Sequence, residues 1–296
     1  MTVDTLERAL EAYAAVLEPA LGASLPEPIG QLARLHEAMR YSVMGGGKRI
    51  RPAFCFAACE AVGGDLPQAV PAAVALELVH TYSLVHDDLP CMDDDDLRRG
   101  RPTNHKVYGD ALAVLAGDAL LTRAFGVLAG ADGDSSRRVA QITALAEAAG
   151  SLGMVGGQAL DLFAEGSEGV DLPTLQYIHT HKTGALFGAS CRLGGLAGGV
   201  DADGAERLAR FGALIGLAFQ IADDLLDETG DPAELGKAAG KDRSRGKATY
   251  PRLLGLDESR RRMEELDRKA EEIATDFGPR GETLVRLARF VIRRNR

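Results

Sequence analysis

Two clusters of aspartate carry the first chemical signal in this sequence. The first holds Asp87, Asp88 and Asp93 within the segment HDDLPCMDDDDLRRG. The second holds Asp223, Asp224 and Asp227 within FQIADDLLDETGD, where the first and last are one turn apart if this segment is a helix. Taken alone, either cluster is also what a solvated acidic turn looks like. Taken together, they match Mg²⁺ sites, in which a few carboxylates leave coordination positions for water and substrate phosphates.

The first aspartate cluster needs a counter-charge. A helix predicted over 67–88 places the first two aspartates at its C-terminal end, where the helix dipole disfavours negative charge. Four more aspartates follow at 93–96. The arginines at 98, 99 and 101 do not by themselves place positive charge between the carboxylates, whereas divalent cations would.

Basic residues supply what a phosphate group would need. The segment GGGKRIRP at 45–52 leads from a glycine loop into a helix start, with Lys48 and Arg51 on one face, which suits an anion. It fails the P-loop pattern at two positions. His80 lies two helical turns before Asp87 on the same predicted face. For each feature alone, a surface turn or a satisfied helical histidine is the ordinary interpretation.

Other polar residues extend this pattern. Gln158 and Asp161 lie three residues apart in GGQALDL, and a polar pair among apolar neighbours is typical of a cavity wall. Four further residues have a solvated surface position as their ordinary interpretation: Lys182, Thr183, Lys237 and Lys247. Other catalytic templates are absent, because the chain has no GxGxxG, HExxH or GxSxG motif and no zinc-ligand spacing.

The elements that position these residues are predicted to be helices. Apolar residues, mostly Ala and Leu, recur every three and four positions, and period-two runs of β-branched residues are missing. Between glycine and proline breakers, the pattern predicts helices at 3–20, 30–43, 51–62, 67–88, 111–130, 136–165, 173–199, 203–228, 248–276 and 281–293. Glycines inside these helices, such as Gly157 and Gly194, indicate either close helix packing or room for a ligand. We predict one all-α domain over residues 1–296.

Composition bounds the class of protein. Apolar residues make up 46% and the net charge is −9, which excludes a disordered chain and disfavours a nucleic-acid binder. No apolar run approaches the roughly 18 residues of a membrane span, so none is expected. Residues 1–11 are acidic and amphipathic, unlike a signal peptide. The four cysteines form no CxxC pair, which fits a reducing cytoplasm, and a cytoplasmic location is therefore expected.

The ordered motifs resemble a known family. They are GGGKRIRP, ELVHTYSLVHDDLPCMDDDDLRRGRPTNHKVYGD, GGQALDL, HKTGALF, FQIADDLLDETGD and GKATYPRLLGL. In this order they resemble the trans-isoprenyl diphosphate synthases, nearest to the bacterial farnesyl diphosphate synthases, with plant-type geranylgeranyl diphosphate synthases next. The resemblance runs from about residue 30 to the end. It implies a single large all-α bundle of the isoprenoid synthase type, with a central cavity between helices, and a homodimer.

The resemblance also implies a role for each site residue. Mg²⁺ ions, three per active site and replaceable by Mn²⁺, would be held by Asp87, Asp93, Asp161 and Asp223, with Asp88 in support. The allylic diphosphate would be bound by Arg98, Lys182, Thr183, Gln220, Lys237 and Lys247. The isopentenyl diphosphate would be bound by Lys48, Arg51, His80 and Arg99. The catalytic set would be Asp87, Asp88, Asp93, Asp223, Lys182 and Arg98. Ala222 departs from the family, whose members often place a polar residue there, and Lys241 could share the role of Lys237.

The implied reaction is prenyl transfer. Ionisation of an allylic diphosphate (dimethylallyl or geranyl) gives an allylic cation, which the alkene of isopentenyl diphosphate attacks. The expected main product is C15 farnesyl diphosphate, because Tyr82 and Ser83 would lie roughly 6–8 Å below the metal site. There the ring of Tyr82 would form the floor of the pocket, and the small Ser83 would leave room for a C10 to C15 tail.

Three alternatives remain open. A geranylgeranyl diphosphate synthase would differ only in pocket depth. A terpene cyclase would not need the site of Lys48, Arg51 and His80. A non-catalytic regulatory subunit should have lost one aspartate cluster, and here both are present.

Overall fold

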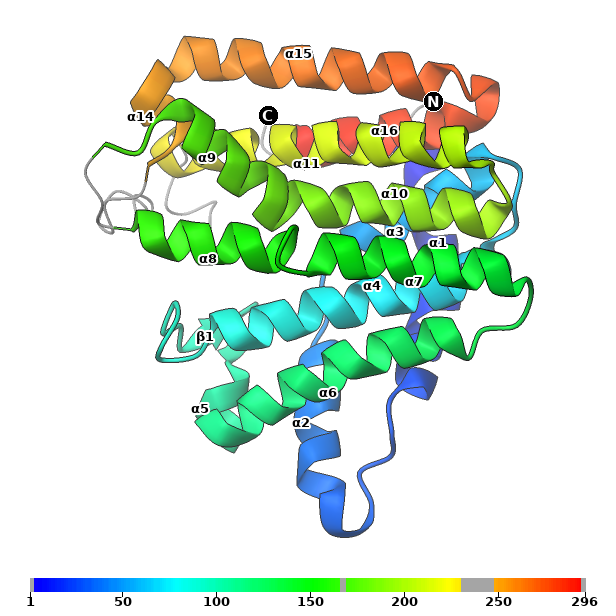
Figure 1. The fold of residues 1–296 in the computed structure, drawn as a ribbon, viewed down its shortest axis with the longest axis vertical. Helices are drawn as coiled ribbons and strands as arrows, with labels where there is room; N and C mark the ends of the chain where they lie inside the picture. The colour runs from blue at the N-terminus through cyan, green and yellow to red at the C-terminus, as the bar shows by residue number, and fades with distance from the viewer. Residues whose placement is uncertain (1–2, 166–168, 230–247, 294–296) are drawn as a thin grey trace.

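The computed structural model describes residues 3–165, 169–229 and 248–293, and these residues are almost entirely helical (Figure 1). This confirms the all-α prediction. The only strands in these ranges are β1 (Leu97–Arg98) and β2 (Arg101–Pro102), which pair antiparallel as a short hairpin.

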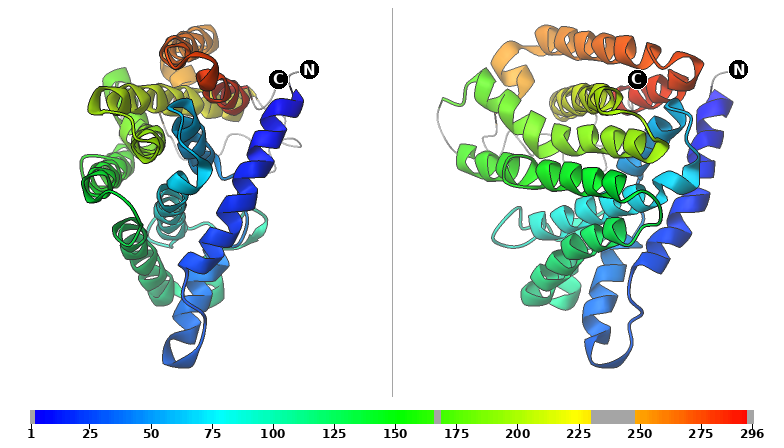
Figure 2. Two further views of the ribbon diagram at one scale, coloured as in Figure 1. Left: turned by 90° about the vertical axis from the view of Figure 1, so that its right-hand side faces the viewer. Right: turned by 45° about the vertical axis from the view of Figure 1, so that its right-hand side comes forward.

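Helices follow one another along the described chain. The first half forms α1 (Val3–Ser24), the 3₁₀ turn η1 (Gly30–Leu32), α2 (Ala33–Val43), α3 (Ile50–Ala61), α4 (Leu66–Asp87), α5 (Asn104–Tyr108) and α6 (Asp110–Ala129). The second half forms α7 (Ser135–Ala149), α8 (Met154–Ala164), α9 (Leu172–Ile178), η2 (His179–Gly184), α10 (Ala185–Gly198), α11 (Ala202–Thr229), α14 (Tyr250–Leu254), α15 (Leu256–Thr275), η3 (Gly278–Gly281) and α16 (Glu282–Ile292). Figure 2 shows α1 running along one side of the molecule, where it packs against α3 and α4.

The core lies where α3, α4 and α10 pack against one another. Every residue of α3 from Pro52 to Cys59 is buried, and a helix that is apolar all round has to be enclosed by others. Helix α4 starts where the sequence predicted, with Asp65 and Gln68 forming a capping box and a proline in the first turn. This fixed start sets the register of α4, which delivers most of the predicted site residues.

Two predicted helices are each divided in the structure. The range 136–165 consists of α7 and α8, because Gly153 takes φ −124° and ψ −127°, outside the helical region. The range 248–276 consists of α14 and α15, because Gly255 has φ +81°, a conformation that glycine adopts without steric cost. The hairpin and α5 were not predicted either, since strands of two residues carry no readable pattern.

Two ranges, 110–129 and 135–164, are long and apolar enough to cross a membrane by length and composition alone. Both ranges contain charged residues, so neither is an unbroken apolar run of the kind that the sequence was predicted to lack. The first range is α6, which packs along α4. The second comprises two helices with a break between them, of which α7 packs on α10. We therefore assign all three helices to the bundle.

Close helix packing explains several glycines inside the helices. A Cβ atom on Gly194 of α10 would lie 2.0 Å from the carbonyl oxygen of Cys55 on α3, which is a steric clash. The backbones of the two helices are therefore too close to admit a side chain at this position. A Cβ on Gly157 of α8 would lie 2.2 Å from the backbone nitrogen of Lys182. At these two positions the packing interpretation is confirmed.

Gly194→Ala should therefore destabilise the protein by about 1–3 kcal/mol, because α3 and α10 must separate to admit the methyl group. Gly126→Ala on α6 is the matched control, since the nearest atom to its added Cβ is 4.0 Å away. The control should be neutral or stabilising by up to about 1 kcal/mol, through helix propensity. Urea unfolding of the two variants measures both values, and equal effects would contradict the packing argument.

Candidate active site

A cavity of about 410 Å³ opens between α3, α4, α8 and η2. Its apolar wall includes Leu84, Met154 and Leu162. The predicted site residues that line it are Arg51, His80, Tyr82, Ser83, Asp87, Lys182 and Thr183. Gln158 lines it as well, as the polar pair in GGQALDL predicted. Residues that the sequence separates by up to 132 positions (51 to 183) thus share one cavity with a polar and an apolar part.

The end of α4 concentrates negative charge at this cavity. The chain turns back after the helix, and the backbone N–H of Asp93 donates to the carbonyl of Asp87 at 2.8 Å. Burial raises the pKa of Asp87 to about 6, against the opposing field of Lys182, and the negative charge of Asp93 adds to the rise. Because the negative charge of Asp87 is costly in this buried position, a cation bound beside it would stabilise the ionised carboxylate.

The aspartates at this site fit a Mg²⁺ ion whose remaining coordination positions would be filled by the substrate. Asp87, Asp93 and Asp223 offer only carboxylate oxygens, the donors that this ion prefers. Within residues 3–165, 169–229 and 248–293, no three His, Cys, Asp or Glu side chains already stand close enough to enclose a metal ion. Substrate phosphate oxygens would therefore have to supply the remaining coordination, as is usual for Mg²⁺.

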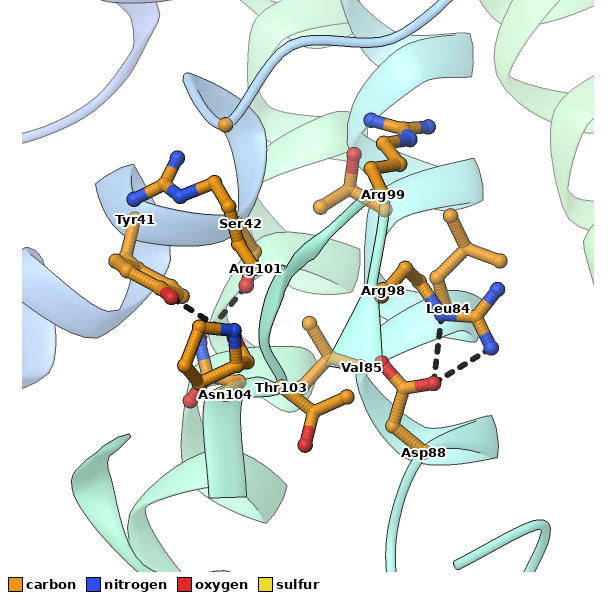
Figure 3. Close-up of a pocket in the computed structure, with 13 residues that line it drawn as sticks. Tyr41, Ser42, Leu84, Val85, Asp88, Arg98, Arg99, Arg101, Thr103 and Asn104 are labelled. Atoms are coloured by element: carbon orange, nitrogen blue, oxygen red, sulfur yellow. Dashed lines mark hydrogen bonds and ion pairs between the residues drawn. The ribbon is translucent and has the colours of Figure 1, made fainter. Parts of the chain in front are cut away.

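Asp88 has a different environment from Asp87. Its side chain is almost fully buried, and its Oδ1 accepts from Nε of Arg98 at 2.6 Å and contacts Nη2 at 2.6 Å (Figure 3). Arg98 also lies 3.6 Å from Asp95. Asp88 therefore orients Arg98, a contact that differs from the support of Mg²⁺ that the resemblance implies for it.

A π-helical turn brings the next group of predicted residues together. Lys182 and Thr183 lie in η2, where the helix widens for one turn, a feature often found at functional sites. The Nζ of Lys182 donates to Oδ2 of Asp161 on α8 at 2.6 Å. The Thr183 hydroxyl donates to Oε1 of Gln220 on α11 at 3.1 Å. Because α8 carries Gly157 at this point, it can approach the widened turn closely.

The aspartates of the second cluster lie on two different faces of α11. Asp223 and Asp227 are partly exposed. Asp224 is buried, accepts from the backbone N–H of Tyr250 at 2.9 Å, and lies 3.5 Å from Nε2 of Gln220. Sequence reasoning did not assign Asp224 a role, although its place on the buried face of the helix was a readable signal. Lys237, Lys241 and Lys247 lie outside the described residues.

The predicted isopentenyl diphosphate residues gather beside α4, with one exception. The Arg51 guanidinium is buried over the ring of Phe187, 5.2 Å from its centroid, and burial lowers the pKa of Arg51 to about 10. Arg99 donates to the carbonyl of Gly46 in the glycine loop. Lys48 is exposed on that loop, and neither Lys48 nor Arg99 lines the cavity.

The hairpin that carries Arg98 and Arg99 is fixed to α2. The Tyr41 hydroxyl donates to the carbonyl of Pro102 at 2.8 Å, and the Arg101 guanidinium lies over the Tyr41 ring at 4.3 Å. The amide of Asn104 donates to the carbonyl of Ala38 and to the hydroxyl of Ser42, both at 2.8 Å. These contacts surround a small pocket of about 50 Å³ that Figure 3 shows beside the Asp88–Arg98 pair.

His80 should give the folded protein a measurable pH dependence. Burial, followed by the fields of Arg51 and Arg99, lowers the pKa of His80 well below its usual value. In the unfolded chain the imidazole takes up a proton as the pH falls through about 6.5, so the unfolded state binds more protons and stability falls below that pH.

Comparing the wild type with His80→Asn isolates this contribution. The wild type should lose up to about 1.4 kcal/mol more per pH unit below pH 6.5 than the variant does. Urea unfolding at several values from pH 7.5 to 5 measures both slopes. Equal slopes would show that His80 takes up its proton over the same pH range in the folded and unfolded states, and would contradict the lowered pKa.

Solved structures share this fold over nearly the whole chain. An apo structure of an FPP/GFPP synthase from Zymomonas mobilis is 43% identical, has a TM-score of 0.89, and the match covers 98% of this chain and 100% of that one. A structure of a geranyltransferase from Helicobacter pylori, complexed with magnesium and isoprenyl diphosphate, is 34% identical with a TM-score of 0.82, covering 94% of this chain and 96% of that one. These neighbours confirm the isoprenoid synthase fold.

Curated relatives are geranylgeranyl pyrophosphate synthases. A chloroplastic enzyme of Catharanthus roseus is 50% identical over 265 residues, which cover 88% of this chain and 74% of the relative. The large subunit 1 of a heterodimeric enzyme of Arabidopsis thaliana, also chloroplastic, is 52% identical over 256 residues, covering 84% and 69%. The expectation of a cytoplasmic location is contradicted by these chloroplastic relatives and is withdrawn.

Comparing the chain with the sequence pattern of the whole family tests the family prediction most directly. The pattern of the polyprenyl synthetase family matches residues 32–277, which include both aspartate clusters and the glycine loop. This agrees with the prenyl-transferring relatives and with the fold. The chain is a member of the polyprenyl synthetase family, the trans-isoprenyl diphosphate synthases.

Proposed function

We propose that this chain condenses isopentenyl diphosphate with an allylic diphosphate and releases pyrophosphate. The observation that carries the proposal is the single cavity in which Asp87 and Lys182 stand beside an apolar wall, with Arg51 and His80 also lining it. Such a cavity can bind two diphosphates, exclude water from an allylic cation and hold both reacting carbons close together. A terpene cyclase would not need the second set of basic residues.

The allylic substrate would bind across the two aspartate clusters. Asp87, Asp93 and Asp223 would hold Mg²⁺, with Asp161 nearby. Bound Mg²⁺ supplies Lewis-acid stabilisation of the charge that develops on the leaving diphosphate. Lys182, held by Asp161 at 2.6 Å, and Arg98, held by Asp88, present cations that need no further ordering as the bond breaks. The Helicobacter pylori structure, complexed with magnesium and isoprenyl diphosphate, supports magnesium as the ion.

The isopentenyl diphosphate would bind to Arg51, His80 and Arg99, with Lys48 closing from the exposed loop. Arginine forks suit a diphosphate that carries no metal of its own. His80 is neutral at pH 7 because its pKa is lowered, so it can accept or donate a hydrogen bond without adding charge. The alkene would then lie against the apolar wall that the allylic tail shares.

The aspartates that would hold Mg²⁺ give the direct test of this function. Asp87→Asn and Asp223→Asn should each lower kcat by about 100-fold or more, because the lost ligand acts on charge that forms in the transition state. Asp96→Asn is the matched control within the same acidic run, since that side chain is exposed and pairs with Lys106 at 2.7 Å.

The assay combines purified protein, Mg²⁺, labelled isopentenyl diphosphate and an allylic starter. EDTA should abolish the activity, and added Mg²⁺ or Mn²⁺ should restore it. Full turnover after exhaustive chelation, or an equal loss in the Asp96→Asn control, would contradict the proposed roles.

For the product, we propose the C20 chain, geranylgeranyl diphosphate. The names of the Catharanthus roseus and Arabidopsis thaliana relatives favour it over the C15 product that the sequence predicted. Farnesyl diphosphate is the second candidate, and one observation favours it. Tyr82 is 5% exposed and lines the cavity on the same helix as Asp87, where a ring limits the space for a growing tail.

Changing the side chains on this wall should change the product length. Tyr82→Ala should lengthen the main product by one or more C5 units, because the cavity deepens where the ring is removed. Ser83→Phe should shorten it by at least one unit, since Ser83 lines the same cavity. Chromatography of the products of the wild type and both variants measures this. If all three make the same chain, the limit lies elsewhere; wild-type C15 product would overturn the C20 proposal.

We also propose a homodimer. Helix α6 exposes Val114 and Leu115, and the neighbouring α7 exposes Val139. Exposed apolar side chains on a protein surface suit a protein partner. The heterodimeric Arabidopsis thaliana relative shows that subunit pairing occurs in this family, although with a different partner.

A further inference from the structure

We infer that the ion pair between Arg49 and Glu77 positions the glycine loop, residues 45–48, and thereby sets the affinity of the adjacent anion site. Arg49 directly follows Lys48, and Arg51 comes two residues later. The inference rests on the proposed function only in naming isopentenyl diphosphate as the ligand of that site. Arg49 and Glu77 are thus positioning residues, acting through the groups beside them.

The backbone of Arg49 takes an unusual conformation. It has φ +46° and ψ +36°, the left-handed region, which residues with a Cβ atom rarely adopt. This residue is the N-cap of α3, so its conformation sets the angle at which the loop enters the helix. Such a conformation persists only where the surroundings hold it.

Three parts of the fold hold the Arg49 side chain in place. Nη1 donates to Glu77 on α4 at 2.8 Å, Nε donates to Glu18 on α1 at 2.8 Å, and Nη2 donates to the carbonyl of Val43 at the end of α2 at 2.9 Å. A guanidinium can bond in three directions at once because its donors form a rigid planar fork. The side chains of Arg49 and Glu77 are only 9% and 2% exposed. The pair therefore fixes the loop end relative to three helices.

Glu77 also acts on the arginines of the anion site. Burial lowers the pKa of Arg51 and that of Arg99, and the negative charge of Glu77 opposes the decrease at both. Arg99 in turn donates a hydrogen bond to the carbonyl of Gly46. Its guanidinium packs so close to the loop that a Cβ atom on Gly47 would lie only 2.5 Å from Nη1 of Arg99. One buried carboxylate thus serves as a common counter-charge for Arg49, Arg51 and Arg99 before any diphosphate binds.

A purely structural ion pair would look the same in the fold, so the experiment separates the two roles. Replacing both partners of a buried ion pair with apolar residues often leaves stability intact, whereas removing one partner does not. The variants are therefore Arg49→Lys, which keeps the charge and loses the fork, Glu77→Gln, and the double variant Arg49→Met with Glu77→Leu. Arg192→Lys is the control, because it alters a surface ion pair with Glu147 at 3.2 Å.

Two measurements are made on each variant beside the thermal midpoint. Steady-state kinetics give KM for each substrate, and calorimetry without metal gives Kd for inorganic pyrophosphate. The three test variants should raise KM for isopentenyl diphosphate and Kd for pyrophosphate by about tenfold or more, since small misplacements of binding groups are costly. KM for the allylic substrate should change by less than about twofold, and Arg192→Lys should change neither.

The double variant decides between positioning and stability. If it melts near the wild-type temperature and still binds the anion weakly, the positioning role stands. If it binds like the wild type, or if both substrates weaken equally, the inference is overturned. A wild type that binds pyrophosphate but forms no prenyl diphosphate product would refute only the proposed function. The Kd values for pyrophosphate in the wild type and the variants would then still test the role of Arg49 and Glu77.

Discussion

Helix α4 imposes the constraint on which the rest of the structure depends, because it carries charged and titratable groups into the interior of the bundle. Glu77, His80 and Asp87 lie along this one helix and Asp88 follows at its C-cap, among residues most of which are apolar and buried. Each such group needs a partner in a region where water is scarce. Neighbouring elements supply several of them: the loop before α3 brings Arg49 and the β1–β2 hairpin brings Arg98. Helix α4 is thus both the centre of the core and the wall of the site.

Much of the site could be read from the sequence because its residues repeat on helical faces. The seven-residue spacing of His80 and Asp87 indicated one face, and both line the cavity. The capping residue Asp65 marked the start of α4 correctly. Helix breaks were harder to predict, because Gly153 and Gly255 lie at breaks between helices while Gly157 and Gly194 lie inside helices. A single glycine has the same local propensity in both cases, and only the packing partner differs.

Contacts between distant segments could not be predicted from spacing. Nothing local pairs Lys182 with Asp161 or Thr183 with Gln220, since these contacts arise where a helix widens for one turn. The two-residue strands carry no period, so the anchoring of the hairpin by Tyr41 was not visible either. Arg49 stands where a P-loop would have Ser or Thr, and no role was predicted for it, because its bond to Glu77 depends on the packing of α3 beside α4.

Asp224 binds a backbone N–H group, which every amino acid except proline has. Its carboxylate accepts a hydrogen bond from the backbone N–H of Tyr250, not from a side chain. As far as this bond is concerned, the amino acid at position 250 is free to vary during divergence, while position 224 is not. The junction at the start of α14 can therefore keep its geometry while the sequence around it drifts. The constraint falls on one side of the contact alone, so no compensating change at position 250 can replace a lost carboxylate at position 224.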